Sequence, residues 1–212
     1  MKKEEKNKDI WANLYRNKKG RSLKKSLYIL RFLEKKHKRI LELFVSSGYN
    51  IEILKSKNKK AECYGIDNDK ELCIQAKKKG YKTITTNCNN IPLEDNTFDL
   101  IYCNSFHHAT KSFNKIFNKS IRLLKKDGLL IGIEPYGIIP RILHSLISKT
   151  PDFIINMFLE DRKTYLKALK HECKVDNVLD WYKIKFKKKI NKYYLIHYKR
   201  DLLGIWYCIK KE

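Results

Sequence analysis

Residues 40–48 read ILELFVSSG, a compact apolar run that is broken only by Glu42 and ends in a short loop at Gly48. An apolar run of this length is typical of a strand buried inside a sheet. Beyond the loop, Ile51 and Leu54 fall at the spacing of a helix. The stretch therefore predicts a buried strand that passes through a glycine-ended loop into a helix.

The same alternation continues along the chain. Gly80 is placed to end a helix, and Asp127 with Gly128 is typical of a turn into a strand. We expect further strands at residues 63–66, 82–86, 98–103 and 129–133, and helices at residues 69–79 and 113–124. Strands that alternate with helices at this spacing predict βαβ units, right-handed crossovers and a parallel sheet.

Both ends of the chain add to this core. Apolar spacing predicts a short helix near Trp11 and a second helix from Ser22 to about His37. After Pro135, the pattern predicts helices at 138–148 and 153–169 and then two strands, at 182–190 and 204–209. These two strands are expected to form an antiparallel pair at one edge of the sheet.

The fold prediction is one α/β domain with a doubly wound, mostly parallel seven-stranded sheet. Its parts are N-terminal helices at 1–38, a core at 39–136, a helical insertion at 137–170 and C-terminal strands at 171–212.

Composition limits the classes of partner. The formal net charge is +24, but nearly all of the positive charge is lysine, whereas readers of nucleic acid often use arginine. A solvated lysine surface is the favoured interpretation, and RNA remains an alternative partner. No apolar run is long enough to span a membrane, and the start of the chain lacks a secretory signal. The six scattered cysteines predict reduced thiols in a cytoplasmic protein, with no metal site.

Four loops lie where strands end, and ligands of an open parallel sheet bind at that edge. They comprise residues 44–48, 66–69, 87–90 and 104–108. Asp67 stands nineteen residues after Gly48, which is the spacing of an acid that accepts hydrogen bonds from a ribose. An aspartate at a strand end is also an ordinary turn former.

Four segments in this order resemble the class I S-adenosylmethionine-dependent methyltransferases, in the subgroup that includes the ubiquinone and menaquinone enzymes. Residues 40–48 are similar to motif I, and YGID at 64–67 with ELCIQAK at 71–77 is similar to motif II. NCNNIPLEDNTFDLI at 87–101 and RLLKKDGLL at 122–130 resemble the later motifs. In the family pattern, an acid is followed by three alternate glycines, whereas this chain has Phe44, Ser46 and Gly48 after Glu42.

The resemblance implies S-adenosylmethionine as cofactor and a cofactor site built from the four loops. The implied cofactor-binding residues are Glu42, Phe44, Ser46, Gly48, Asp67, Asn68, Asn87, Cys88 and Asn104. Asn87 stands where the family has an aspartate near the adenine, and its carbonyl still accepts a hydrogen bond. The phenylalanine ring at 44 is expected either to fill the methionine end of the site or to turn outward.

The resemblance also implies methyl transfer, in which the chain chiefly positions an acceptor and some members add a general base. His107, His108 and Glu134 are the candidates for that base, against the alternative that they only cap local structure. The expected acceptor is a small molecule. The alternatives are a degenerate, non-catalytic binding module, supported by Phe44 and Ser46, and an RNA or protein methyltransferase that uses the lysine-rich last third. The acceptor's identity and the oligomeric state remain open.

Overall fold

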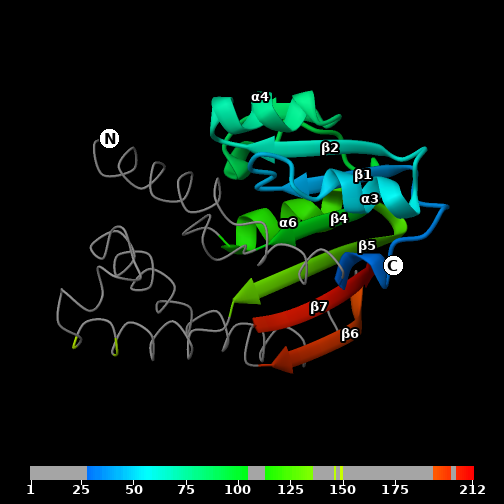
Figure 1. Ribbon diagram of the computed structural model, residues 1–212. Coiled ribbons are helices and arrows are strands. Elements are labelled where there is room, and N and C mark those ends of the chain that lie inside the picture. The colour runs from blue at the N-terminus through cyan, green and yellow to red at the C-terminus, as the bar shows by residue number, and fades with distance from the viewer. Residues whose placement is uncertain (1–27, 105–112, 136–145, 147–148, 150–192, 202–203) are drawn as a thin grey trace.

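The structure is a computed structural model that describes residues 28–104, 113–135, 146, 149, 193–201 and 204–212. Seven strands form one sheet in the order β3-β2-β1-β4-β5-β7-β6. Figure 1 shows this sheet with the β6–β7 pair at one side and β2, below α4, at the other. All pairs among β1 to β5 are parallel, and β7 is antiparallel to both β5 and β6. The predicted fold class is confirmed.

The chain order of the elements follows the predicted alternation. The strands are β1 (Arg39–Leu43), β2 (Glu62–Asp67), β3 (Lys82–Thr85), β4 (Phe98–Asn104), β5 (Leu124–Pro135), β6 (Tyr193–Asp201) and β7 (Gly204–Lys211). The helices are α3 (Ile51–Lys57), α4 (Lys70–Lys78), the 3-10 turn η1 (Cys88–Asn90) and α6 (Phe113–Leu123). Asp69 caps α4, because its carboxylate accepts the backbone N–H groups of Glu71 and Leu72.

Side chains alternate between two apolar clusters, one on each face of the sheet. In β1, Leu41 and Leu43 join the cluster that α6 covers with Ile116 and Phe117, and Ile40 joins the opposite cluster. That opposite cluster also contains Leu54 of α3, Ala76 of α4, and Ile29 and Leu33 of the segment before β1. A strand that buries both of its faces explains why the sequence of β1 is an almost continuous apolar run.

The junction between β5 and β7 depends on one glycine. Gly132 pairs with Tyr207, and a Cβ atom at Gly132 would lie 1.9 Å from the Tyr207 ring. The ring therefore lies directly over the glycine, and Tyr207 is fully buried. Gly132 thus makes room for the side chain that fills the core where the sheet changes from parallel to antiparallel.

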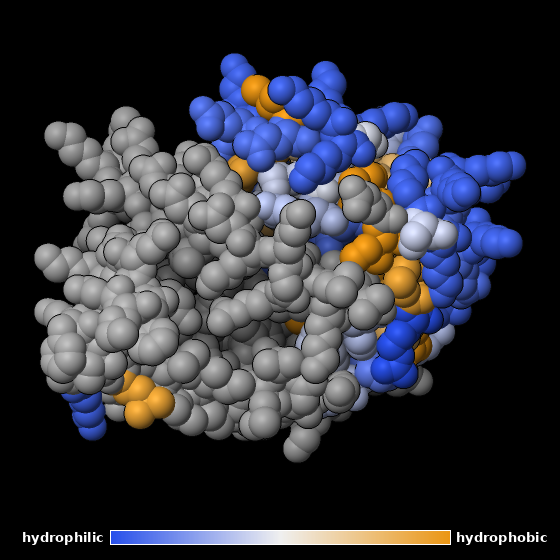
Figure 2. Space-filling view, viewed as in Figure 1, coloured by the Kyte–Doolittle hydropathy of each residue, from blue (hydrophilic) through white to orange (hydrophobic). Residues whose placement is uncertain are grey.

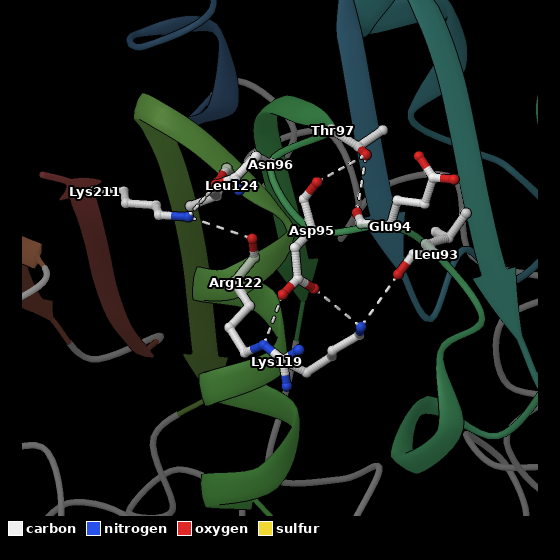
Figure 3. A network of polar contacts seen from close by, with 9 residues as sticks. All are labelled: Leu93, Glu94, Asp95, Asn96, Thr97, Lys119, Arg122, Leu124 and Lys211. Carbon is white, nitrogen blue, oxygen red and sulfur yellow. Dashed lines mark hydrogen bonds and ion pairs between the residues drawn. The ribbon is translucent and has the colours of Figure 1, made fainter.

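A polar network fixes the amino-terminal edge of the sheet (Figure 3). Asp95 accepts hydrogen bonds from Arg122 Nε at 2.8 Å and from Lys119 Nζ at 3.3 Å. Lys211, at the end of β7, donates to the Asn96 side chain at 2.8 Å and to the Leu124 carbonyl at 2.6 Å. The network connects the loop before β4, the end of α6 and the last strand.

Three sequence predictions differ from the structure. The strand that pairs with β7 is Tyr193–Asp201 and not 182–190, which lies outside the described residues. The turn expected at Asp127 and Gly128 is an irregularity within β5, where Asp127 has a φ of 62° and the register with β4 shifts. The helix expected to reach about His37 ends at Leu30, and turns follow it.

Several predictions fall outside the described residues. They include the helix near Trp11, the start of the helix at Ser22 and the helical insertion at 137–170, apart from the isolated helical residues Leu146 and Lys149. The division of the chain into these parts therefore stays a prediction. In the part of the chain that the structure describes, no helix is long and apolar enough to cross a membrane.

Candidate active site

The loop after β1 keeps a backbone that glycine normally supplies. Phe44, Ser46 and Gly48 have φ values of 57°, 50° and 73°. These are the three alternate positions at which the family pattern has glycine. Left-handed backbone costs a residue with a side chain about 1–2 kcal/mol, so two of the three positions carry strain that their surroundings must offset.

Backbone hydrogen bonds hold the loop in this shape. The Val45 N–H donates to the Ile66 carbonyl at 3.0 Å, and the Ser46 N–H donates to Asp67 Oδ2 at 2.9 Å. The Gly48 N–H turns back to the Val45 carbonyl at 3.0 Å. The loop is thus fixed to the end of the neighbouring strand β2, and this attachment can supply the energy that the left-handed residues cost.

Gly48 is required for space as well as for its backbone angle. A Cβ atom there would lie 2.9 Å from Ala76 Cα in α4 and 3.1 Å from the Tyr81 ring. Gly65 makes a similar close approach, because a Cβ at that position would lie 2.7 Å from the Val45 side chain. The loop therefore packs tightly between α4 and β2.

The Phe44 ring is half-buried and packs against the core cluster on the α6 face of the sheet, which contains Leu43, Ile66 and Cys88. Cys88 in this cluster is buried, and burial raises the pKa of its thiol to about 12. The core contact accounts for a phenylalanine at this strained position. Of the two sequence-based alternatives, the outward-turned ring is not what the structure shows.

Asp67 is buried at the end of β2 and holds two loops. Its Oδ2 accepts the Ser46 N–H, and its Oδ1 accepts the Asp69 N–H at 3.1 Å. Burial raises the pKa of Asp67, and the two N–H donors act in the opposite direction because they stabilise the charged form. Each carboxylate oxygen retains a lone pair for a further donor.

Glu42 lies beneath the loop in a fully buried polar group. Its two oxygens accept hydrogen bonds from the Asn50 amide and from the Tyr81 hydroxyl. Burial raises the pKa of Glu42 to about 7, and these two donors oppose the shift. Asn50 directly precedes α3, and Tyr81 directly precedes β3. Glu42 therefore links β1, which lies before the loop, to the starts of both elements.

The remaining cofactor candidates lie in the loops after β2, β3 and β4. Asn87 is exposed, and its side-chain carbonyl accepts the Asn89 N–H at 2.9 Å, so it caps η1. Cys88 is buried, Asn68 is exposed, and Asn104 is half-buried at the end of β4. Because β1 to β4 run parallel, their carboxyl ends bring all of these loops to one edge of the sheet.

The candidates for a general base are not placed in detail. His107 and His108 lie outside the described residues. Glu134 pairs with Ile205 near the end of β5, which puts its backbone at the same carboxyl edge, and its side chain is outside the described part. A catalytic role for these three residues stays a prediction.

Sequence reasoning missed two residues that support the site. Tyr81 and Asn50 hold Glu42, but neither stands in a recognisable motif, and only the packing of α4 against the loop brings Tyr81 there. Ser47 is buried inside the loop, and its hydroxyl has no hydrogen-bond partner among the described residues.

Comparisons with known proteins agree with this geometry. Residues 41–132 match the profile of a family described as methyltransferase domain. No functionally curated protein is similar enough to count as a match.

Among solved structures, the plantazolicin methyltransferase BpumL in complex with SAH superposes with a TM-score of 0.62 at 13% identity, over 88% of this chain and 80% of that one. A SAM-dependent methyltransferase from Aquifex aeolicus superposes with a TM-score of 0.56 at 16% identity, over 88% of each chain. The MccD protein superposes with a TM-score of 0.59 at 16% identity, over 88% of this chain and 96% of that one. Identities this low establish a shared fold. The chain therefore has the fold of the class I S-adenosylmethionine-dependent methyltransferases, and residues 41–132 within it are similar to the methyltransferase domain family.

Proposed function

We propose that the chain transfers a methyl group from S-adenosylmethionine to a small-molecule acceptor. The observation that carries the proposal is the left-handed backbone at Phe44, Ser46 and Gly48, fixed to the buried Asp67. A loop that no longer bound a ligand would not need to hold two residues with side chains in the strained left-handed conformation. Retention of the shape without two of the glycines supports a site that still binds.

The residues fit the cofactor at its two polar parts. Asp67 has free lone pairs beside the loop, where ribose hydroxyls can donate to it. Asn87 and the buried Cys88 lie after β3, where they would line the adenine end. Glu42 is already bonded on both oxygens, so we assign it to holding the loop in position rather than to contacting the cofactor.

S-adenosylmethionine, when bound, supplies an activated methyl group on a sulfonium. The chain then needs to orient the acceptor and exclude water. His107, His108 and Glu134 are the proposed sources of a base, because β4 and β5 end at this edge. One neighbour of this fold is named a plantazolicin methyltransferase and was solved with SAH and a desmethylPZN analog, which supports a small-molecule acceptor here. The five described cysteines are buried thiols outside disulfides, which fits the cytoplasmic location that we propose.

Calorimetric titration with S-adenosylmethionine and S-adenosylhomocysteine tests the proposal. We expect micromolar binding by the unaltered chain and at least a tenfold loss in Asp67→Ala, because a buried acceptor of hydroxyl donors is removed. Glu71→Ala removes an exposed carboxylate from the same region and is the matched control. Asp67→Asn keeps one acceptor and should give an intermediate loss.

Two results would contradict the proposal. The first is no binding of either compound to a chain that unfolds cooperatively, which would favour the non-catalytic binding module. The second is equal affinity in the unaltered chain and in Asp67→Ala, which would place any binding elsewhere. Binding that is lost in both Asp67→Ala and Glu71→Ala, with unchanged melting temperatures, would show that general negative charge matters rather than this carboxylate.

A further inference from the structure

The turns that precede β1, β2 and β3 form a basic surface at the edge of the sheet opposite the candidate active site. They are residues 34–39, 57–62 and 77–82, which we call the lysine ledge. The three strands are neighbours in the sheet, in the order β3-β2-β1. Because the strands are parallel, the turns before them lie side by side, and β1 separates the ledge from the cofactor loop by about 16 Å for a strand of five residues.

Charge is distributed unequally between the two edges. The ledge contains eleven lysine and arginine residues and two glutamates. The loops at the carboxyl ends of the same strands, residues 44–50, 67–71 and 86–91, contain one lysine and three acids. Figure 2 shows hydrophilic residues crowded along the side of the molecule where α3, α4 and the turns beside them lie. The positive charge around these three strands is therefore concentrated at their amino-terminal ends.

The ledge has a fixed backbone. The buried Asn58 side chain donates to the carbonyls of Glu34 at 3.2 Å, Lys35 at 3.3 Å and His37 at 2.7 Å. The Glu62 N–H donates to the Lys38 carbonyl at 2.8 Å. Two of the three turns are therefore joined, and the lysines that project from them start from set positions.

The two acids of the ledge are already occupied. Glu62 pairs with Arg39 at 3.6 Å and with Lys82 at 3.2 Å, and Glu34 pairs with Lys36 at 3.0 Å. Within the part of the chain that the structure describes, no carboxylate forms an ion pair with the eight other lysines of the ledge: Lys35, Lys38, Lys57, Lys59, Lys60, Lys77, Lys78 and Lys79. Their mutual repulsion is relieved by an external anion of high charge density.

We propose that the lysine ledge binds the phosphate backbone of a nucleic acid without sequence preference. Lysine acts toward phosphate as a point charge, and the one arginine of the ledge is held by Glu62, so the surface lacks the free arginine forks that read bases. None of the large exposed apolar side chains among the described residues lies on the ledge, which disfavours insertion into a lipid surface. The bound strand lies away from the cofactor edge, so the ledge anchors the protein and does not present the methyl acceptor.

Fluorescence anisotropy with a labelled single-stranded RNA of about 20 nucleotides tests the proposal. The test variant changes Lys35, Lys59, Lys60 and Lys78 to glutamine. The matched control changes Lys183, Lys185, Lys187 and Lys188 to glutamine and so removes the same charge from the lysine-rich last third. We expect the ledge variant to bind about tenfold more weakly at moderate salt, and the slope of log affinity against log salt to fall by about 3, since about 0.7 is lost per phosphate contact.

The control variant should bind within about twofold of the unaltered chain, and saturating S-adenosylhomocysteine should leave RNA affinity unchanged. Equal losses in both variants would overturn the proposal, because net charge alone would then explain binding. Binding to vesicles that contain phosphatidylserine but not to RNA would replace the nucleic acid with a membrane surface and also overturn it. Circular dichroism and melting of both variants establish that the comparison is between folded proteins.

Discussion

Replacement of Gly48 by alanine measures how tightly the cofactor loop is built. The backbone contribution is about 1–2 kcal/mol, because the residue has a φ of 73°. The steric contribution is about 1–3 kcal/mol, because the new Cβ would lie 2.9 Å from the Cα of Ala76, a backbone atom of α4 that cannot move alone. We therefore expect Gly48→Ala to lower the free energy of unfolding by about 3 kcal/mol.

Gly80→Ala is the matched control for this change. Gly80 also has a positive φ, of 104°, but no atom lies within 4 Å of a Cβ placed there. Its substitution should therefore carry only the backbone cost. Urea denaturation of both variants, with the slope checked for constancy, gives the two free energies. A loss in Gly48→Ala no larger than that in Gly80→Ala would refute the close packing of the loop on α4.

Four further results are expected. Ser46→Gly should change the free energy of unfolding by less than about 1 kcal/mol in urea denaturation, because relief of left-handed strain offsets the greater freedom of the unfolded chain. The variant should keep its calorimetric affinity for S-adenosylmethionine. A loss of affinity would show that the Ser46 side chain contributes to the site. Glu42→Gln should reduce the loss of unfolding free energy that the unaltered chain shows as the pH rises from about 4.5 to 7. The reason is that the pKa of Glu42 is raised to about 7, so the folded state retains a proton that the unfolded state releases. Denaturation at several pH values that gives a constant stability difference between the two proteins would contradict this. Tyr193→Phe should raise stability by about 1 kcal/mol, since this buried hydroxyl has no partner among the described residues, and a loss in urea denaturation would reveal one. Lys211→Met should lower the free energy of unfolding by about 1–2 kcal/mol, because three hydrogen-bond acceptors lose their donor. The control Lys126→Met, at an exposed position, should leave this free energy nearly unchanged.

The parallel half of the fold follows directly from the sequence, because each buried strand reads as an apolar run. β2, β3 and β4 lie within one residue of their predicted bounds. The last part does not follow so simply. Residues 182–190 alternate in polarity, whereas 193–201 begin with four aromatic or aliphatic residues, and only pairing with β7 identifies 193–201 as the edge strand. Alternation indicates a half-exposed strand but carries no information about its partner.

The sequence predicted which loops lie at the cofactor edge, but it did not predict which side chains contact one another there. Strand order alone brings the loops that contain Asp67, Asn87 and Asn104 together. The partners of each side chain depend on packing between elements distant in sequence, such as Tyr81 beneath Glu42. The family resemblance implies that Glu42 belongs to the site, and only the structure shows that its two oxygens are already engaged.

The altered motif I separates two properties that glycine usually provides together. Glycine permits left-handed backbone, and it also leaves space for a close approach. At Gly48 both are needed, and glycine is present. At Phe44 and Ser46 only the backbone shape is kept, through the hydrogen bond from the Ser46 N–H to Asp67 and through packing of the Phe44 ring against the core. A loop of this kind retains its shape as long as β2 and η1 hold it. Its tolerance for side chains at two of three positions therefore depends on the surrounding contacts and cannot be judged from the glycine count of the motif.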